Sequence, residues 1–579
     1  MKTFCIQTLG CKVNAYESEQ LATLLRRRGL TQASAEQADL RVVHTCSVTM
    51  QAASQSRQAV RRMVRLPIFT QTPPEAISIL GEPNASSEPT SSQPEPARNE
   101  PGQPIRRSRV IVTGCWATSD AAQAAAMAGV DAVLTHHQDV ALELDRLLTL
   151  WREQPPHGPP MTAPDQSLVT TSLQNRGNEN AGMIPAAAPI RQITQNIRPN
   201  SHVDVNQNSS SLETQSDQEK HAAKEGWEGW ENGRANTAPS RTGITSLPQL
   251  DSRQTGRQRA FLKIQDGCDA HCTYCIIPTL RPRLWSKPID AAVDEAKALT
   301  EAGHVEIVLT GIFLGAYGQP TALRRRQGQS TGAHLARLID ALCTRVPALS
   351  RLRLSSLEPG DLTDDLLSVL RSHRQIVPHF HLPLQSGSDV LLRRMNRQYT
   401  RTDFLRMVDR VRAAYDRPAL TTDVVVGFPG ETPEEFTPTA DAVRSAGFIH
   451  VHAFPYSPRP GTAAARWTSQ FVRGPVVNER IEQLRAMAAE QSLAYRQSFI
   501  GQSVDVIIER DSAEFSRTAD PDVHHGRCER YFSVRVKALA AKPGDSLRAK
   551  IVQVSGEQTM GELTRAVSRL ENPGQQLVR

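Results

Sequence analysis

The sequence predicts a multidomain α/β protein with an N-terminal parallel α/β domain, a partial (β/α)6 TIM-like barrel and a C-terminal all-β domain. Strand-like and helix-like segments alternate over residues 1–65 and again after residue 257, which is typical of parallel sheets. Short strand-like runs separated by Gly, Asp and Pro follow from about residue 500. A chain of 579 residues is also too long for one hydrophobic core, so several domains are expected.

The N-terminal domain is predicted to span residues 1–152. Its strand-like segments are KTFCIQTLG, RVVHTC and RVIVTGC, and helix-like segments such as SEQLATLLRRRG and SRQAVRRMVR follow them. A polar, low-complexity stretch at about 66–107 interrupts this pattern, and we expect it to be a disordered insertion. Residues 153–256 are rich in Pro, Ser, Asn, Gln, Thr and Gly, so we expect a disordered linker there.

Residues 257–498 contain six short apolar strand-like segments that alternate with helices, from AFLKIQDG to HVHAFPYS. Six such units predict a parallel barrel or part of one, with its chemistry at the C-terminal ends of the strands. A helical stretch leads to residues 499–565, where GQSVDVIIE, RYFSVRVKA and LRAKIVQVS predict a small all-β domain. A tail at 566–579 completes the chain.

Net charge and cysteine content limit the classes of function. The net charge of +7 and the pI near 9.0 suit a polyanionic partner but do not identify it. The first residues lack a secretory signal pattern, and no apolar run reaches the roughly 20 residues that cross a bilayer. We therefore expect a cytoplasmic protein with no membrane partner, in which nine cysteines are thiols or metal ligands rather than disulfides.

Cys268, Cys272 and Cys275 form a C-x3-C-x2-C motif directly after the first predicted barrel strand. Three thiolates on one short loop can hold three irons of a [4Fe–4S] cluster and leave the fourth iron open. S-adenosylmethionine (SAM) can chelate that open iron and be cleaved to a radical. A structural zinc site is the alternative, but it needs a fourth ligand, and His271 lies inside the loop.

Cys11, Cys46 and Cys115 are far apart in sequence, yet each ends a predicted strand. The C-terminal ends of parallel strands lie on one edge of a sheet, so these three sulfurs can converge on a second cluster. A glycine before two of them permits close approach. Three unrelated buried cysteines are the alternative. For Cys5, Cys343 and Cys528, packing is the favoured interpretation.

These motifs resemble the methylthiotransferase family of radical SAM enzymes. The resemblance covers about 1–65, 108–152 and 257–565, and it implies an N-terminal cluster domain, a radical SAM partial barrel and a C-terminal TRAM domain. The segments TLGCKVNAYESE, KIQDGCDAHCTYCIIP, LSSLEPGDL and FPYSPRPGTAA resemble the branch that acts on N6-threonylcarbamoyladenosine of tRNA. Branches acting on isopentenyladenosine, or on a ribosomal protein aspartate, are the alternatives.

The resemblance implies two [4Fe–4S] clusters and SAM as cofactors. Cys11, Cys46 and Cys115 would bind the auxiliary cluster, and Cys268, Cys272 and Cys275 the radical SAM cluster. Five further residues would contact SAM, namely Tyr274, Glu358, Gln385, Ser386 and Asp423. For the four strand-end residues among them, a capping role is the alternative. The expected partners are the tRNA anticodon loop and an electron donor such as flavodoxin or ferredoxin, with the protein as a monomer.

The chain departs from the family pattern at three positions. Pro282 and Trp285 stand where the family has Gly and Arg, within TLRPRLWSKP, and His44 replaces the usual Asn near the second cluster cysteine. None of these changes removes a cysteine ligand. The altered segment follows the radical SAM motif, where it could reshape the mouth of the site.

The C-terminal segment interleaves cations with aromatic rings, as RNA-binding surfaces do. The residues are Arg527, Arg530, Arg535, Lys537, Arg548, Lys550, Tyr531 and Phe532. An ordinary basic β-domain with its aromatic residues in the core is the alternative. Two other classes of function also remain open: an Fe–S RNA-binding protein without catalysis, and a radical SAM enzyme of another reaction type.

Overall fold

The computed structural model describes residues 1–68, 107–153, 247–250, 258–323, 333–510, 522–538 and 541–567. Nearly all of the predicted insertion at 66–107 and most of the predicted linker at 153–256 lie outside the described residues, as does the tail from 568. Among the described residues, no helix has the length and apolar character that a membrane span requires.

The N-terminal domain is a five-stranded, fully parallel sheet with the order β2-β1-β3-β4-β5. Its strands are β1 (Thr3–Thr8), β2 (Thr31–Gln32), β3 (Leu40–Thr45), β4 (Arg109–Gly114) and β5 (Ala132–Leu134). Its helices are α1 (Lys12–Arg27), α2 (Met50–Arg65), α3 (Cys115–Ser119), α4 (Ala121–Ala125) and α5 (Val140–Glu153). Buried leucines of α1 and α5 pack in one apolar cluster, and residues of α2 and α3 pack in another.

This strand order reverses between β1 and β3, where open α/β sheets bind ligands at the C-terminal edge. The helix after β1 starts at Lys12, which is earlier than the segment beginning at Ser18 that the sequence predicts. The helix after β3 begins at Met50 and is capped by Thr49, whose side chain accepts a hydrogen bond from the Ala52 amide at 3.0 Å. Both loops at the reversal are therefore short.

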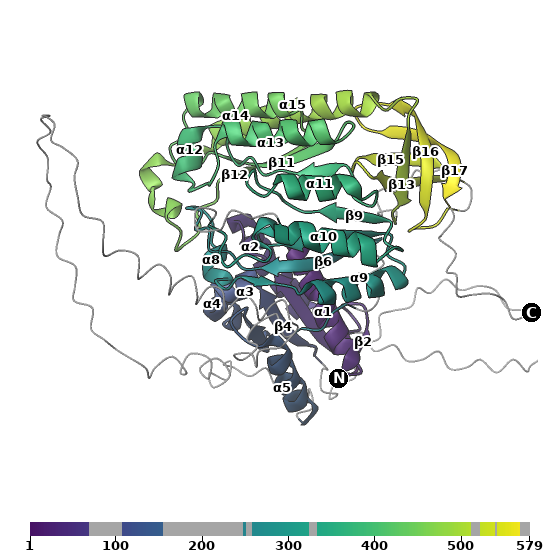
Figure 1. The fold of residues 1–579 in the computed structure, drawn as a ribbon. Coiled ribbons are helices and arrows are strands. Elements are labelled where there is room, and N and C mark those ends of the chain that lie inside the picture. Colours follow the sequence, from purple (N-terminus) through teal and green to yellow (C-terminus); the bar gives the residue numbers. More distant parts are fainter. Residues whose placement is uncertain are drawn as a thin grey trace, which may run out of the picture. The chain divides into compact units, whose positions relative to one another are not determined.

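The second domain is an open barrel of six parallel strands, as the sequence predicts (Figure 1). They form two ladders, β6 (Arg259–Asp266), β8 (Glu306–Gly311) and β9 (Arg351–Leu354), then β10 (His379–His381), β11 (Ala419–Val426) and β12 (His450–Pro455). Single parallel bridges, Leu352 to Ile376 and Ser356 to His381, join the ladders. A short strand, β7 (Trp285–Ser286), pairs antiparallel with the end of β6.

The barrel helices are α8 (Ile277–Leu280), α9 (Ile289–Glu301), α10 (Ala333–Arg345), α11 (Asp364–Ser372), α12 (Asp389–Arg394), α13 (Arg401–Ala414), α14 (Pro433–Ala446) and α15 (Gly474–Gln497). The barrel helices other than α8 pack on one large apolar cluster with the strands, and Leu280 of α8 packs with Cys115 and Ile276 instead. Four of them begin after a Ser or Thr whose side chain accepts an amide of the first turn, at Thr363, Ser388, Thr400 and Thr432.

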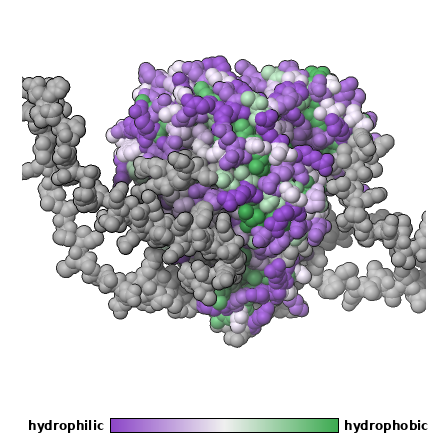
Figure 2. All heavy atoms as spheres, in the orientation of Figure 1, coloured by the Kyte–Doolittle hydropathy of each residue, from purple (hydrophilic) through white to green (hydrophobic). Residues whose placement is uncertain are grey.

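The third domain is a closed five-stranded barrel, with the order β13-β14-β15-β17-β16. Its strands are β13 (Ser503–Ile508), β14 (Val523–Cys528), β15 (Ser533–Lys537), β16 (Ser546–Val554) and β17 (Thr559–Val567). Buried residues alternate with exposed ones along β15 and β16, which directs Lys537, Arg548 and Lys550 outward. On the face drawn in Figure 2, hydrophilic residues cover most of the described part and hydrophobic ones show as small areas.

Residues 247–250 differ from the prediction of a disordered linker. Leu247 and Leu250 are buried at 7% and 5% exposure, and Gln20 of α1 donates a hydrogen bond to the Pro248 carbonyl at 2.8 Å. The Leu250 amide donates to Glu295 Oε1 of α9 at 3.1 Å. Two leucines in a polar context are a weak sequence pattern, yet they fill an apolar site between α1 and α9.

Candidate functional site

The structure brings Cys11, Cys46 and Cys115 together at the C-terminal edge of the N-terminal sheet. Cys11 precedes α1, Cys46 follows β3, and Cys115 begins α3 directly after β4. Asn14 lies between two of them, since its Oδ1 is 3.8 Å from the Cys11 Sγ and 4.0 Å from the Cys115 Sγ. The backbone of Cys46 is held by Ser56, which accepts its amide at 3.0 Å and donates to its carbonyl at 2.9 Å.

Two glycines make this approach possible. A Cβ at Gly10 would lie 2.7 Å from the Cys46 Cβ and 2.9 Å from its Sγ, and a Cβ at Gly114 would lie 2.4 Å from the Thr45 carbonyl oxygen. Both glycines have positive φ, 100° and 97°. Only glycine combines that backbone conformation with that space, so the residue before each cysteine is dictated by the convergence of the loops.

Asn14 also fixes the loops themselves. Its Nδ2 donates to the Leu9 carbonyl at 2.8 Å and to the Thr45 carbonyl at 3.0 Å. The sequence interpretation did not include Asn14, although its position three residues after Cys11 on a helix places both on one face. Burial raises the pKa of the Cys115 thiol to about 12 and also raises that of Cys46, because a charged thiolate is disfavoured away from water.

Cys268, Cys272 and Cys275 lie on the loop that follows β6. Segment 394–397 supports this loop, because Asn396 Nδ2 donates to the Ala270 and His271 carbonyls at 3.1 Å each. The Ala270 amide donates to the Cys268 Sγ at 3.4 Å. Burial raises the pKa of Cys268 and of Cys275 to about 12. The three cysteines line a cavity of about 120 Å³.

Arg397 is a residue of this cavity that the sequence interpretation missed. Its Nη1 donates to the Cys272 Sγ at 3.2 Å, and its Nη2 forms an ion pair with Glu358. Burial disfavours the charged guanidinium, but Glu358 more than offsets this and holds the pKa of Arg397 well above its ordinary value. The segment RRMNRQYT carries no cysteine or strand-end pattern, so only the fold reveals that it reaches the cysteines.

The residues predicted to contact SAM fall into different places. Tyr274 and Glu358 line the cavity of Cys268. Gln385 and Ser386 follow β10, where Ser386 is fully buried and the Gln385 amide donates to the Asp423 carbonyl at 2.9 Å. The Asp423 side chain lies instead in a larger cavity described below. Their contacts with SAM stay predictions.

The two cysteine loops are in direct contact. Cys115 packs with Ile276 and Leu280, which immediately follow the Cys275 loop. On the other side, Arg459 of the loop after β12 donates to Ser47 Oγ, next to Cys46, at 3.3 Å. The strand ends of two separate sheets therefore face one another.

A buried network of charges joins the same two domains. Glu17 of α1 is fully buried and accepts hydrogen bonds from Arg281 at 2.8 Å on both carboxylate oxygens and from Lys263 Nζ at 2.8 Å. Arg281 and Lys263 also donate to Asp266, with distances of 2.8 to 2.9 Å. Burial alone would raise the pKa of Glu17, but Arg281 and Lys263 hold it well below its ordinary value.

Two histidines surround Glu17. The His44 ring lies with Nδ1 3.0 Å from Ser18 Oγ and Nε2 3.5 Å from the Glu17 carboxylate. For the second histidine, His136, burial and the nearby Arg281 lower the pKa to about 4. Glu17, His44 and His136 have the spacing of a metal site, but the Arg281 guanidinium bonds to both Glu17 and His136. A cation is already present there, so this cluster is structural.

The segment with the altered residues Pro282 and Trp285 crosses the start of the cysteine loop. The Cys268 amide donates to the Arg281 carbonyl at 3.1 Å, and Trp285 lies in β7 beside the end of β6. Gly267 has φ 78°, and a Cβ there would lie 1.8 Å from the Arg283 carbonyl oxygen. The segment is thus bound to the cysteine loop despite its unusual residues.

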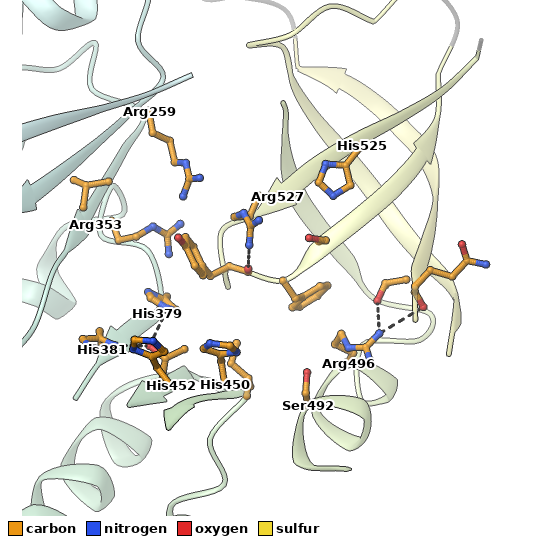
Figure 3. A pocket seen from close by; sticks show the side chains of 18 of the residues that line it. Arg259, Arg353, His379, His381, His450, His452, Ser492, Arg496, His525 and Arg527 are labelled. Atoms are coloured by element: carbon orange, nitrogen blue, oxygen red, sulfur yellow. Dashed lines mark hydrogen bonds between the residues drawn. The ribbon is translucent and has the colours of Figure 1, made fainter. Parts of the chain in front are cut away.

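A second cavity, of about 750 Å³, lies between the inner side of the barrel strands and the C-terminal domain (Figure 3). We call it the barrel cavity. It is rich in cations, with six Lys or Arg side chains in its wall against two acids. The cations are Lys12, Arg259, Arg353, Arg496, Arg527 and Arg535, and the acids are Asp423 and Glu557.

Tyr531 is at the centre of these cations. Three guanidinium groups lie over its ring, those of Arg527 at 4.7 Å, Arg353 at 4.9 Å and Arg259 at 5.3 Å from the centroid. Figure 3 shows these three groups pointing toward one another from the two domains. Phe532, in contrast, is buried in the core of the C-terminal barrel at 6% exposure, so for this ring the core alternative is right.

The cysteine geometry fits clusters better than a single zinc ion. A tetrahedral zinc site with Zn–S bonds of 2.3 Å requires sulfurs about 3.8 Å apart. Within the described part of the chain, the metal-ligand groups whose atoms all lie within 4.8 Å of one another include no cysteine. All nine cysteines are free. Three converging thiols at a wider spacing suit a cluster, where each thiolate binds a different iron.

Two family descriptions match this chain. Residues 3–82 match the Uncharacterized protein family UPF0004, and residues 262–443 match the Radical SAM superfamily. The first range contains Cys11 and Cys46, and the second contains the C-x3-C-x2-C motif.

Curated relatives are enzymes of tRNA modification. The chain is 30% identical over 569 residues to the threonylcarbamoyladenosine tRNA methylthiotransferase of Bacillus subtilis, covering 98% of this chain and 97% of that protein. It is 38% identical over 278 residues to the enzyme of that name from Chlamydia pneumoniae, covering 48% and 63%. A tRNA-2-methylthio-N(6)-dimethylallyladenosine synthase of Cereibacter sphaeroides is 34% identical over 324 residues, covering 56% and 69%.

Among solved structures, the radical S-adenosylmethionine methyltransferase TsrM from Kitasatospora setae aligns with a TM-score of 0.44 and 13% identity. The alignment covers 80% of this chain and 77% of that one.

Proposed function

The chain belongs to the methylthiotransferase family of radical SAM enzymes, and we propose that it converts N6-threonylcarbamoyladenosine of tRNA to its 2-methylthio derivative. The modified base is the adenosine immediately 3′ of the anticodon. The observation that carries the proposal is the pairing of two cysteine triplets whose loops touch through Cys115, Ile276 and Leu280. A radical SAM enzyme with a single cluster has no need of the N-terminal triplet.

We assign the N-terminal triplet, Cys11, Cys46 and Cys115, to an auxiliary [4Fe–4S] cluster. The barrel triplet, Cys268, Cys272 and Cys275, is assigned to the cluster that binds SAM. When bound, the clusters and SAM supply a 5′-deoxyadenosyl radical and a methylated sulfur, which functionalise an adenine C–H bond that acid–base chemistry cannot activate.

The residues of the chain position these groups. Arg397 donates to one barrel sulfur and pairs with Glu358, so it stabilises negative charge on the thiolate and orients a carboxylate at the rim of the cavity. Asn14 has a different role, since its Oδ1 accepts from the Cys11 and Cys115 thiols while its Nδ2 holds the Leu9 and Thr45 carbonyls. Tyr274, partly buried and with Phe428 at 6.3 Å between ring centroids, contributes an apolar wall to the cavity.

We assign RNA binding to the C-terminal domain. Lys537, Arg548 and Lys550 are exposed on its strands and can neutralise phosphates. A tRNA substrate supports a cytoplasmic location. A reduced flavodoxin or ferredoxin would supply the electron for SAM cleavage, and one chain holds both triplets, which suits a monomer.

Mass spectrometry of tRNA nucleosides tests the proposal. Cells that lack the protein should contain N6-threonylcarbamoyladenosine without its 2-methylthio derivative, and the reconstituted protein should restore it in vitro with SAM and a reductant. Loss of the methylthio derivative of isopentenyladenosine would move the protein to the sister branch of tRNA enzymes. An unmodified ribosomal aspartate would move it to the branch that modifies protein.

A further inference from the structure

Lys12 lies in the wall of the barrel cavity, where Tyr531 and Asp423 attract its charge without a direct contact. Arg353 donates to Glu306 at 2.7 and 3.0 Å, and Arg259 donates to Glu509 at 3.0 Å, so both guanidinium groups are largely neutralised. The Lys12 ammonium forms no hydrogen bond or ion pair with any residue that the structure describes. Keeping a half-buried cation without a hydrogen-bond partner costs free energy, and an anionic ligand in the cavity would remove that cost.

Two further side chains of the same cavity each have a buried nitrogen that makes no hydrogen bond. These nitrogens are Arg527 Nε and His379 Nδ1, although Arg527 Nε lies 3.6 Å from the Glu509 carboxylate. Both residues lie beside Tyr531, with Arg527 4.7 Å over the ring and the His379 ring centroid 4.6 Å away. Glu509 already accepts a hydrogen bond from Arg259 at 3.0 Å, so the donors of Lys12 and Arg527 border one space in which positive charge exceeds negative charge.

Asp423, the acid on the barrel side, does not fill this need. Its two carboxylate oxygens are occupied by His381 and His452, each at 3.2 Å. The cavity keeps an excess of positive charge, and it has room for an organic group rather than for an ion alone.

The proposed substrate offers a matching anion. A threonylcarbamoyl group ends in a carboxylate, which is ionised near neutral pH because an ordinary α-carboxyl has a pKa of about 3.5. An isopentenyl group is neutral and apolar. Resting on the proposed function, we propose that Lys12, together with Arg527, binds the carboxylate of the threonylcarbamoyl group and thereby selects this base.

The position of Lys12 also suits the reaction. It follows Cys11 in sequence, so one short segment of the chain carries both a predicted ligand of the auxiliary cluster and a cation in the wall of the barrel cavity. A tRNA phosphate is a weaker match, because phosphates lie on the outside of the RNA and exposed cations such as Lys537 and Lys550 can meet them.

The test compares two anticodon stem-loop RNAs, one with N6-threonylcarbamoyladenosine and one with its carboxylate replaced by a carboxamide. The dissociation constant Kd of each is measured with the cluster-loaded protein. The unchanged protein should bind the acid more tightly than the amide by about 10-fold or more, since a charge-assisted bond contributes about 1.5–3 kcal/mol. Lys12→Gln should bring the ratio close to one, and Lys12→Arg should keep most of it.

Two controls accompany the measurement. Lys297→Gln removes an exposed lysine of α9 and should leave the ratio unchanged. Arg527→Gln lies away from the cysteines and should also lower the ratio, which keeps the test valid if Lys12→Gln loses iron. If Lys12→Gln and Arg527→Gln both keep the preference of the unchanged protein for the acid RNA over the amide RNA, the proposal is wrong. It is also wrong if the variants lose affinity equally for both RNAs, which would indicate a phosphate contact.

Failure of the inference and failure of the proposed function give different results. If the unchanged protein forms a methylthio product on the acid RNA but binds acid and amide equally, only the carboxylate site is wrong. If it forms no methylthio product on the acid RNA, the proposed function is wrong.

Discussion

Glu17 illustrates how much one side chain can determine where two domains meet. It is fully buried, and two cations of the barrel, Arg281 and Lys263, neutralise it. A buried ion pair contributes little net stability over an apolar pair, but removing one partner is costly because the other charges remain. Its value lies in fixing α1, and hence Cys11, against the barrel.

The first prediction follows from this charge. Glu17→Gln should lower the free energy of unfolding by about 3–5 kcal/mol, because Arg281 and Lys263 lose a buried counter-charge. Urea unfolding measures the change. Glu482→Gln, at an exposed pair on α15, should change the free energy by less than about 0.5 kcal/mol and serves as the control. A tolerated Glu17→Gln would contradict the role of the network.

The same carboxyl group predicts a loss of stability in acid. The pKa of Glu17 in the folded protein is well below the ordinary value of 4.5, despite burial, because of Arg281 and Lys263. Below pH 4.5 the unfolded chain therefore binds a proton that the folded chain does not, so stability falls as the pH falls toward the folded pKa. In Glu17→Gln this part of the acid dependence should disappear from unfolding curves measured at several pH values.

A third prediction concerns the cysteines. The loaded protein should contain about eight irons, and replacing either triplet by Ala should leave about four. Loss of the Cys268 triplet should abolish SAM cleavage, whereas loss of the Cys11 triplet should spare cleavage and stop sulfur insertion. Iron analysis and 5′-deoxyadenosine assays measure both results.

Cys343→Ala, in the apolar core of the barrel, is the control and should keep the full iron content. Unchanged iron after loss of the Cys11 triplet would disprove the auxiliary site.

At the scale of single residues, the cysteines at strand ends could be predicted from sequence because the apolar pattern of each strand stops where its cysteine stands. Asn14, Arg397 and Lys12 could not be, since their partners come from other elements. Arg397 reaches Cys272 from 125 residues away in the chain. Lys12 meets Arg353 and Tyr531 only once all three domains are in place.

In the C-terminal domain, the alternation of side chains along short strands determines which cations are exposed to solvent. Alternation along β15 and β16 directs Lys537, Arg548 and Lys550 outward while Val534, Val536, Ala549 and Ile551 form the core. Of the predicted cations, Arg530 is engaged with Glu529 and lies 4.9 Å over Phe499, so it supports the domain rather than a surface.

The fourth prediction belongs to these strands. The triple variant K537Q/R548Q/K550Q should weaken tRNA binding and reduce the slope of log affinity against log salt by about two to three, because each lost phosphate contact removes about 0.7–0.9. Binding measured at several salt concentrations decides it. The triple variant K297Q/R406Q/R444Q removes the same charge elsewhere and should keep the slope. Equal slopes in the two variants would refute the assignment.

Elements with strong periodicity were predictable, and weak ones were not. The six barrel strands and the strands carrying β1, β3 and β4 match the sequence pattern. The strands β14 and β17 were missed because VHHGRC and TMGELTRAV lack an apolar alternation of their own. The start of α1 was placed too late, because the polar residues Asn14 and Glu17 look exposed in sequence but are buried against Thr45 and Arg281.

For the whole molecule, the long segment between the first two domains provides the fifth prediction. Replacing residues 162–242 by a flexible Gly/Ser linker should leave iron content and activity largely intact, since the composition implies no packed core. A deletion extended to residue 250 should lower the midpoint of thermal unfolding, because it removes Leu247 and Leu250 from their buried sites. Collapse of the shorter variant would reveal an ordered or functional segment.

The barrel cavity has walls from more than one domain, and this has a consequence for how such enzymes can be recombined. Tyr531 and Arg527 come from the C-terminal domain, while Lys12 comes from the N-terminal one. A domain that supplies part of the wall of the barrel cavity cannot be exchanged between relatives without changing the cavity. In chimaeras between relatives, substrate preference should therefore be inherited only when Lys12 and the loop around Tyr531 are transplanted as a matched pair.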